Sequence, residues 1–207
     1  MLIAGSKGHA IEILQLLEEN GIHPIAFFDD VTPLTPPFLY EKYRILTNPQ
    51  KAQELFVQSS EFMLGLGHPR NRRIVFDKLI AWGGKCVSVI ANTARIGKYS
   101  TLSAGANVMH HTFIGNNAHI GIGCLINSHS SIHHDACLGD FCEIAPGAKI
   151  LGGASIGANT FIGANAVILP KVMLGSNVTI GAGAVITKNI PDNATAIGVP
   201  GRIIKIS

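Results

Sequence analysis

From Ile90 to about Thr187, a branched aliphatic residue stands at every sixth position of the chain. These residues are Ile90, Ile96, Leu102, Val108, Ile114, Ile120, Ile126, Ile132, Leu138, Ile144, Ile150, Ile156, Ile162, Ile168, Leu174, Ile180 and Ile186. The fourth residue after each is small or compact, and glycine often follows the aliphatic directly. Neither the 3.6-residue period of a helix nor the alternation of a strand produces a strict six. Such a repeat is typical of a parallel β-helix, in which each short strand buries one face against neighbouring coils.

The period also predicts how residues stack. Three hexads close one triangular coil, so residues eighteen apart should lie above one another, with glycine favoured at the bends between the flat sides. Cys124 and Cys142 are eighteen apart, both at the small inward position, and we interpret them as buried packing residues rather than a disulfide or a metal pair. The pattern resembles the hexapeptide-repeat acyltransferases, and this resemblance implies a left-handed coil.

The segment before the repeats begins with an apolar strand, Met1–Ala4, followed by the glycine turn Gly5–His9 and by helical spacing up to Gly21. A strand, a glycine turn and a helix leave backbone N–H groups facing an anion. A second apolar run, Ile25–Phe28, ends in Asp29–Asp30, about where an acidic residue would meet a ribose or a base. The glycine spacing is shorter than the dinucleotide fingerprint, so a nucleotide site and a plain tight turn both remain open.

Further along, Phe62–Gly67 is typical of another buried strand, Arg70–Trp82 has helical spacing, and Cys86–Val89 predicts a last strand. We therefore expect an α/β domain with a small Rossmann-like parallel sheet over residues 1–88, a β-helix over 89–190 and a C-terminal tail over 191–207. A ligand of the first domain should lie at the carboxyl ends of its strands. The candidate binding residues are Lys7, Gly8, His9, Asp29, Asp30 and Gly67.

Composition limits the partners and the compartment. A net charge of +3 over 207 residues is too small to indicate nucleic-acid binding, and no aromatic and basic stripe is present. The four cysteines lack the spacing of a disulfide framework, which favours a reducing compartment. The chain begins without a signal-peptide pattern, and no apolar run reaches the length of a membrane span. We expect a cytoplasmic protein that binds neither nucleic acid nor membrane.

Ionisable residues of the repeats are gathered into about two coils. Between residues 90 and 190 the acidic residues are Asp135, Asp140 and Glu143, and the histidines are His110, His111, His119, His129, His133 and His134. His119 and His133 fit solvated or packing positions, while His110, His111 and His129 are candidates for a subunit contact. At His133-His134-Asp135 a bend is expected, where side chains leave the coil. An imidazole beside a carboxylate is the usual composition of a general base and its tuning partner, so we assign a functional role to His134.

The segment from Asn127 to Asp140 resembles the active-site coil of the bacterial sugar acetyltransferases of the NeuD/PglD type. That family also carries a small nucleotide-sugar domain ahead of a left-handed β-helix, and a tail similar to Ile197–Lys205. The resemblance covers nearly the whole chain. It implies a cytoplasmic acetyltransferase that uses acetyl-CoA, without a metal, to acetylate a nucleotide-linked amino sugar, with UDP as the favoured nucleotide.

Residue by residue, the resemblance makes His134 the general base and Asp135 the neighbour that orients it or raises its basicity. Gly5–His9, Asp29–Asp30 and Gly67 fall where the family holds its nucleotide. Acetyl-CoA in such enzymes lies between adjacent β-helices of a homotrimer, and the matching positions are Glu143, Gly152, Ala164 and Ala182. Two positions depart from the pattern: Lys7 is usually a small residue, and Glu143 replaces a second active-site histidine. The second departure leaves the identity of the acceptor open.

The mechanism we expect is direct transfer in a ternary complex, with the backbone N–H groups of Gly152-Gly153 holding the oxyanion. A homotrimer is also favoured by apolar residues expected on the outer faces. These residues are Val108-Met109, Phe113, Leu125 and Phe161.

Three alternatives remain open at this stage. The enzyme could O-acetylate a sialic-acid-like sugar instead. It could be a zinc enzyme like the γ-type carbonic anhydrases, with His129 and His134 as ligands, although Thr93 stands where the third ligand is expected. It could also be a non-catalytic nucleotide-sugar sensor, against which the presence of His134 together with Asp135 speaks.

Overall fold

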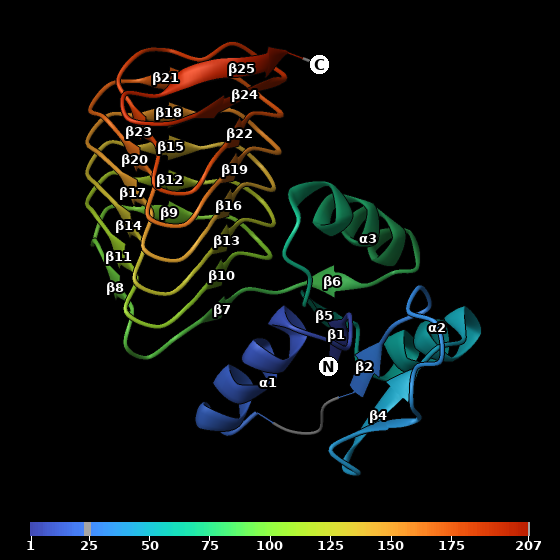
Figure 1. Cartoon of the computed structure of the whole chain (residues 1–207). Helices are drawn as coiled ribbons and strands as arrows, with labels where there is room; N and C mark the ends of the chain where they lie inside the picture. Colours follow the sequence, from blue (N-terminus) through green and yellow to red (C-terminus); the bar gives the residue numbers. More distant parts are fainter. Residues whose placement is uncertain (23–25, 207) are drawn as a thin grey trace. The chain divides into compact units, whose positions relative to one another are not determined.

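The computed structural model describes residues 1–22 and 26–206, in which the chain forms two compact units (Figure 1). The first comprises Met1–Gly67 and Asn71–Val89, and the second consists mainly of the chain from Ile90 onward. The first is an α/β unit with a parallel sheet and the second a left-handed parallel β-helix, which confirms the predicted fold class. No helix among the described residues is both long and apolar enough to cross a membrane.

The sheet of the first unit has the strand order β3-β4-β2-β1-β5-β6. Its strands are β1 (Leu2–Ala4), β2 (Ala26–Phe28), β3 (Phe38–Leu39), β4 (Tyr43–Leu46), β5 (Glu61–Leu64) and β6 (Lys85–Cys86). All neighbouring pairs are parallel except β3 with β4. The central strand β1 is fully buried, as expected for a parallel strand that is covered on both faces. Ile25, predicted as part of the second strand, lies outside the described residues.

Three helices in the described part of this unit are α1 (His9–Glu19), α2 (Pro49–Gln58) and α3 (Pro69–Ala81). Helix α1 buries the predicted apolar positions Ala10, Ile13, Leu14 and Leu17. Strand β4 and helix α2 were not predicted from the sequence. The start of α2 does carry a local signal, because the Asn48 side chain accepts a hydrogen bond from the N–H of Gln50 at 2.8 Å and Pro49 stands in the first turn.

The β-helix has three flat faces, each a parallel sheet. The first face contains β7 (Val89–Ile90), β10 (Asn107–Val108), β13 (Leu125–Ile126), β16 (Glu143–Ile144), β19 (Phe161–Ile162) and β22 (Thr179–Ile180). The second contains β8 (Arg95–Ile96), β11 (Phe113–Ile114), β14 (Ser131–Ile132), β17 (Lys149–Ile150), β20 (Val167–Ile168) and β23 (Val185–Ile186). The third contains β9 (Thr101–Leu102), β12 (His119–Ile120), β15 (Cys137–Leu138), β18 (Ser155–Ile156) and β21 (Met173–Leu174).

Strands that pair within a face are offset by eighteen residues, as Ile132 and Ile150 are, which confirms the stacking rule. We call the turns from the first to the second face the first corner, those from the second to the third the second corner, and those from the third to the first the third corner. The tail adds β24 (Ala194–Ile197) beside β22 and then β25 (Arg202–Ile206), which pairs antiparallel with β24.

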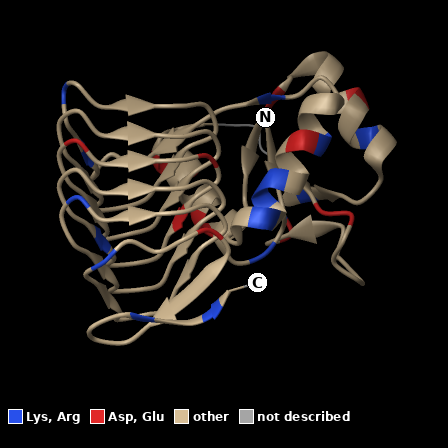
Figure 2. Ribbon diagram, turned by 90° about the horizontal axis from the view of Figure 1, so that it is seen from above, with Lys and Arg blue, Asp and Glu red and all other residues tan. Residues whose placement is uncertain are grey.

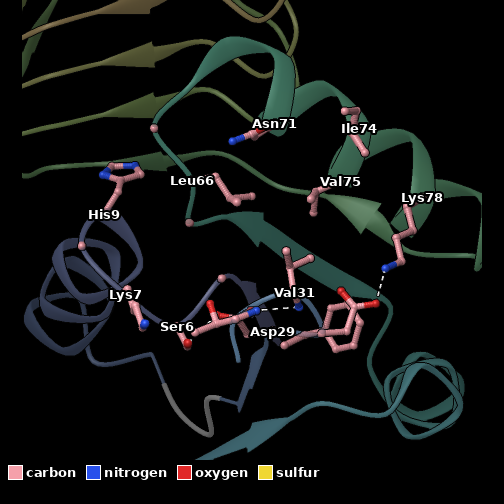
Figure 3. Close-up of a pocket in the computed structure, with 17 residues that line it drawn as sticks. Ser6, Lys7, His9, Asp29, Val31, Leu66, Asn71, Ile74, Val75 and Lys78 are labelled. Carbon is pink, nitrogen blue, oxygen red and sulfur yellow. Dashed lines mark hydrogen bonds and ion pairs between the residues drawn. The ribbon is translucent and has the colours of Figure 1, made fainter. Parts of the chain in front are cut away.

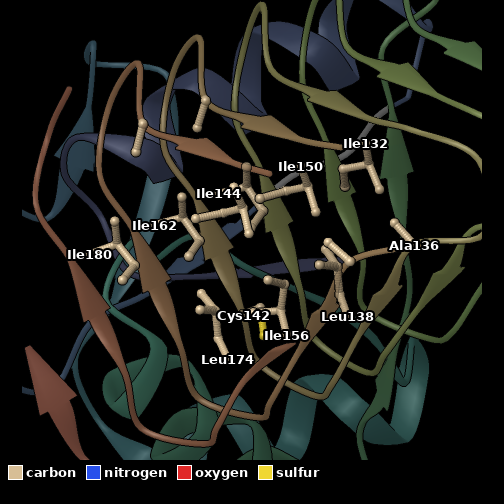
Figure 4. Close-up of a cluster of buried hydrophobic side chains, with 14 of the residues drawn as sticks. Ile132, Ala136, Leu138, Cys142, Ile144, Ile150, Ile156, Ile162, Leu174 and Ile180 are labelled. Carbon is tan, nitrogen blue, oxygen red and sulfur yellow. The ribbon is translucent and has the colours of Figure 1, made fainter. Parts of the chain in front are cut away.

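The aliphatic residues of the hexads fill the interior of the β-helix (Figure 4). Ile132, Ile144 and Ile150 are fully buried, whereas Ile90 and Ile96 of the first coil are 41% and 37% exposed. Cys124 and Cys142 are also fully buried, and each thiol donates to a backbone carbonyl at 3.2 Å. The prediction that they are packing residues is confirmed.

The predicted apolar outer surface is largely wrong. Val108 points inward and is fully buried, and Met109 and Leu125 are 3% and 1% exposed. Phe161 is partly buried, and Phe113 alone of this set is clearly exposed, at 46%. Only Val108 of this set is the inward residue of its hexad, whereas Met109 and Leu125 are buried at other positions of the coil. Most of the predicted residues are therefore not available on the surface to support a trimer.

Candidate active site

His134 lies at the second corner of the β-helix, where the chain turns from β14 to β15. Its ring is 70% exposed and therefore points away from the aliphatic interior. The adjacent coils fix the main chain of this turn on both sides. The N–H of Gly153 donates to the carbonyl of His134 at 2.9 Å, and the N–H of Asp135 donates to the carbonyl of Asn116 at 3.1 Å.

Asp135 holds the imidazole of His134 from within the same turn. Nδ1 of His134 lies 2.8 Å from Oδ2 of Asp135, and the side-chain amide of Asn117 donates to Oδ1 at 3.2 Å. These hydrogen bonds, first that of His134 and then that of Asn117, hold the pKa of Asp135 below its ordinary value. The ionised carboxylate can only accept, so Nδ1 carries the ring proton and Nε2 presents a lone pair.

Gly152 leaves room for the ring of His134. A methyl group on Cα of Gly152 would lie 2.6 Å from both Cε1 and Nε2 of His134. Ordinary contacts between carbon atoms are about 3.5–4.0 Å, so the ring occupies space that only glycine leaves open. The imidazole of His134 therefore packs over the Gly152-Gly153 turn of the next coil.

The predicted pair of oxyanion donors needs a correction. The N–H of Gly153 already donates to His134 in the ladder between coils, so it is not available to a ligand. The N–H of Gly152 has no hydrogen-bond partner among residues 1–22 and 26–206. Of the two amides, that of Gly152 is the one that could stabilise a developing oxyanion beside Nε2.

The first unit contains a cavity of about 590 Å³ at the carboxyl ends of β1, β2 and β5 (Figure 3). The glycine turn after β1, the segment after β2, the loop after β5 and one face of α3 form its walls. The structure brings all the predicted binding residues of this unit to the cavity wall. They are Lys7, Gly8, His9, Asp29, Asp30 and Gly67.

The glycine turn leads directly into the N-terminus of α1. Gly8 precedes the helix with a φ of 43°, and no side chain caps the first turn. In the described part of the chain, the N–H groups of Lys7 and Gly8 have no hydrogen-bond partner. Open N–H groups at the positive end of a helix dipole favour an anionic ligand.

Asp29 joins the segment after β2 to the glycine turn. Its carboxylate accepts hydrogen bonds from the hydroxyl groups of Ser6 at 2.5 Å and Thr32 at 2.9 Å, and from the N–H of Thr32 at 2.9 Å. Burial raises the pKa of Asp29, but the hydrogen bonds from Ser6 and from Thr32 and Val31 lower it more, and the net pKa is below the ordinary value. Because these bonds occupy the carboxylate, Asp29 supports the turn rather than offering free oxygens to a ligand.

Asp30 is the acidic residue that remains at the cavity wall. It forms an ion pair with Lys78 of α3. The ammonium of Lys78 also lies 5.2 Å from the ring centre of Phe28 and 5.0 Å from that of Trp82. This pair connects the segment after β2 to α3, and both residues line the cavity.

Two buried polar side chains support the cavity, His9 within its wall and Arg72 behind it. The imidazole of His9 is 7% exposed and contacts Glu12 at 2.9 Å, and its pKa is lowered, chiefly by burial. Arg72 is fully buried and donates to the carbonyls of Leu64 at 3.0 Å and Leu66 at 2.7 Å. These bonds hold the end of β5 and the loop that follows it against the cavity.

Comparison with known families matches both units. Residues 1–79 match the PglD N-terminal domain, and residues 153–188 match the bacterial transferase hexapeptide (six repeats). Perosamine N-acetyltransferase from Caulobacter crescentus, solved with CoA and GDP-perosamine, is 28% identical over 99% of this chain and 96% of its own, with a TM-score of 0.92. The acetyltransferase domain of PglB from Neisseria gonorrhoeae FA1090, solved with acetyl coenzyme A, is 27% identical over 98% of both chains, with a TM-score of 0.89. This chain is a NeuD/PglD-type sugar acetyltransferase.

WeeI from Acinetobacter baumannii AYE is a further structural relative of the acetyltransferase, at 25% identity over 98% of both chains and a TM-score of 0.87. Among curated proteins, a sequence search finds no match. These matches confirm the family resemblance, and they make the protein an acyltransferase.

One copy of the acetyltransferase does not bring the predicted acetyl-CoA residues together. Gly152 lies at the second corner with His134, whereas Ala164 and Ala182 lie at the first corner. Glu143 is half-buried on the first face, between Leu125 and Phe161 of the neighbouring strands.

The histidines of the first corner do not join the His134 site. His111 and His129 stack at the first corner, with ring centres 4.9 Å apart. His129 and His134 thus leave the β-helix at opposite ends of β14, and they do not form the ligand pair that the zinc alternative requires. Over the described residues, no group of three or more His, Cys, Asp and Glu side chains is arranged to hold a metal ion.

The contribution of α3 to the cavity was not predicted from the sequence. Asn71, Ile74, Val75 and Lys78 recur at the three- and four-residue spacing of one helical face, and all line the cavity. Polar residues at both ends of an otherwise apolar helical face were the available signal. That spacing shows that the four residues share one face of the helix. It does not show that this face lies at the carboxyl ends of the strands.

Proposed function

We propose that the protein transfers an acetyl group from acetyl-CoA to the amino group of a nucleotide-linked sugar, with His134 as general base. The observation that carries the proposal is the exposed imidazole whose Nδ1 is bound by Asp135 and whose ring packs over a bare glycine turn. The relatives solved with CoA and GDP-perosamine or with acetyl coenzyme A support the two substrate classes.

In this mechanism, Nε2 of His134 removes a proton as the sugar amine attacks the thioester carbonyl carbon. The tetrahedral intermediate then collapses, the carbon–sulfur bond breaks, and the imidazolium returns its proton to the leaving thiolate of CoA. Asp135 keeps the proton on Nδ1 and stabilises the imidazolium. A positioned general base typically contributes about 10²–10⁴-fold in rate, and the N–H of Gly152 could stabilise the oxyanion.

The cavity of the first unit is the proposed nucleotide site. The open N–H groups of Lys7 and Gly8 suit a diphosphate, and the ion pair of Asp30 with Lys78 offers both a donor and an acceptor to a base or a ribose. The resemblance favours uridine, whereas the Caulobacter relative was solved with GDP-perosamine. The test below therefore includes sugars that are linked to different nucleotides.

We also propose a cytoplasmic homotrimer. The four predicted acetyl-CoA residues lie at two corners and on one face of a single β-helix, so they could line one groove only if two copies supply them. A trimer would place a first corner of one copy beside a second corner of another. The free cysteines are compatible with a reducing compartment. Light scattering of the purified protein tests the trimer, and a monomer at micromolar concentration would contradict it.

Activity is tested by incubating the protein with acetyl-CoA and a panel of UDP-, GDP- and dTDP-linked sugars, with and without a 4-amino group. Release of free thiol gives the rate, and the mass of the product shows which atom is acetylated. We expect turnover with an amino sugar and its loss by orders of magnitude in His134→Asn. Transfer only to hydroxyl groups would show that the acceptor is a hydroxyl group rather than an amino group. Binding of CoA without any transfer would favour a non-catalytic nucleotide-sugar sensor.

A further inference from the structure

The basic residues of the β-helix gather on one side. Between residues 90 and 190 they are Arg95, Lys98, Lys149, Lys171 and Lys188. Arg95 and Lys149 point outward from the second face, and the three others lie at the second corner. In Figure 2 the blue segments of the coils lie along one edge. This is the corner that carries His134, and the first and third corners of residues 90–190 hold no lysine or arginine.

From His134 toward the C-terminus, the next turn of the second corner presents two glycines, and the two turns after it present lysines. Gly152-Gly153 forms the next turn, and Pro170-Lys171 the one after it. The side chain of Lys171 lies along the bare turn, because a methyl group on Gly153 would lie 3.4 Å from its Cγ. The last turn of the corner is two residues shorter, since Ile190 pairs with Leu174, and it presents Lys188.

Lys171 and Lys188 are exposed and available to an anion. Within residues 1–22 and 26–206, neither forms an ion pair or a side-chain hydrogen bond. The other basic residues of this side differ. Lys149 donates to the carbonyl of Gly147 at 3.3 Å, and the ammonium of Lys98 lies 5.6 Å from the ring centre of Tyr99.

The position of Lys188 matches the length of the arm of CoA. Lys188 is three coils from His134, and coils spaced like neighbouring strands, at about 4.8 Å, give roughly 14 Å along the axis. Thirteen bonds separate the sulfur of CoA from its first phosphorus. An extended chain advances roughly 3.5 Å for every three backbone bonds, so the arm spans roughly 15 Å. A thioester beside Nε2 of His134 would thus place the first phosphate at Lys188, with Lys171 on the way.

We propose that Lys171 and Lys188 form the subsite for the phosphate groups of acetyl-CoA, a proposal that rests on the proposed acetyl transfer. An ammonium group binds phosphate oxygens through charge-assisted hydrogen bonds. The pair fixes the direction of the co-substrate, with the thioester at His134 and the nucleotide end toward the C-terminus. It also adds two binding residues that the family resemblance does not assign.

The test uses Lys171→Ala, Lys188→Ala and the double variant in the full-length protein. Lys98→Ala is the matched control, because Lys98 lies at the same corner but two coils from His134 in the opposite direction. Each protein is assayed with acetyl-CoA and with S-acetyl-pantetheine, which has the same arm and no phosphate. We expect each single variant to raise KM for acetyl-CoA about 3–10-fold and the double variant about 10–50-fold, at unchanged kcat, because exposed ion pairs are individually weak. With S-acetyl-pantetheine, all variants should match the wild type.

A KM for acetyl-CoA in the double variant equal to that of Lys98→Ala would overturn the proposal. So would equal losses with both donors, because they would show that the lysines act on the arm or on the fold rather than on phosphate. Failure of the proposed function has a different signature, since the wild-type protein would then transfer no acetyl group from either donor. If it still binds CoA, the same comparison is made by calorimetry, with dissociation constants for CoA and pantetheine.

Discussion

The glycine that faces His134 offers the sharpest test of the catalytic site. In Gly152→Ala, the added methyl group would lie 2.6 Å from Cε1 and Nε2 of the imidazole. The contact involves the far end of a side chain that is 70% exposed, so the ring can move outward into solvent. The fold should therefore tolerate the methyl group, whereas the position of the base should change.

The size of the effect follows from the geometry. To restore a contact of about 3.5 Å or more, the ring must retreat by roughly 1 Å. A misplacement of about 1 Å in a reacting group can cost about 10²-fold in rate, or about 2.7 kcal/mol of transition-state stabilisation. The movement also weakens the 2.8 Å contact between Nδ1 and Asp135, which adds to the loss. We expect kcat to fall about 100-fold while KM for acetyl-CoA changes less than 3-fold, since the variant removes no charged contact.

The assay follows thiol release at saturating substrates, with thermal unfolding measured in parallel. Lys98→Ala serves as the control for a neutral change at the same corner and should keep both kcat and Tm. The expected pattern is a variant with nearly native Tm and about 1% of wild-type kcat. Full activity in Gly152→Ala would refute the proposal that Nε2 of His134 acts from the position described here. A large drop in Tm would refute the expectation that the ring can move away without disturbing the coil.

Four further variants and one labelling experiment test other parts of the structure. Asp135→Asn should lower kcat by at least 10-fold with little change in Tm, because the residue is exposed and a neutral amide no longer stabilises the imidazolium; unchanged kcat would contradict its assigned role. Native protein should react with a thiol reagent at Cys137 alone, since Cys86, Cys124 and Cys142 are buried and burial raises the pKa of Cys86 to about 12; the other three should react only in denaturant. Ile150→Ala should reduce the free energy of unfolding in urea by about 2–5 kcal/mol, and Ile96→Ala, in the partly exposed first coil, by clearly less. Burial lowers the pKa of His9 in the folded protein, so as pH falls below about 6.5 the unfolded chain takes up a proton at His9 more readily than the folded protein. The free energy of unfolding should therefore drop between pH 7 and pH 5, and the drop should be smaller in His9→Gln.

The architecture could be predicted because the hexad repeats the same packing problem in every coil. A residue such as Ile150 meets the same partners as Ile132 eighteen positions earlier, so one local rule determines the whole interior. The first unit has no such redundancy. Strand β4 and helix α2 follow a proline-rich loop, and their apolar residues, such as Ile45 and Phe56, become meaningful only beside the sheet. The same limit explains why α3 was recognised as a helix but not as a wall of the cavity.

At the candidate site, the sequence predicted which residues gather but not what their atoms do. The cluster of histidines with Asp135 and the eighteen-residue rule were enough to place His134 beside Gly152. The spacing of residues in the sequence does not predict which N–H groups and carboxylates already form hydrogen bonds to another coil or loop. The N–H of Gly153 is used by the ladder and the carboxylate of Asp29 by Ser6 and Thr32, so both lost the direct ligand contacts expected of them.

The division between coil interior and corner explains how this fold can carry a catalytic group at little cost to stability. Hydrogen bonds between main-chain atoms and the inward aliphatic residues hold each coil, and neither depends on which side chain leaves a corner. The second corner accordingly presents asparagine, histidine, glycine and lysine in successive turns without a change in the ladder. The sequence at this corner is constrained only locally. Asp135 and Lys171 take left-handed backbone angles here. Gly152 must lack a side chain because the ring of His134 lies over it. Function at this site is therefore limited by the space between adjacent corners, and substitutions there should alter catalysis before they alter folding.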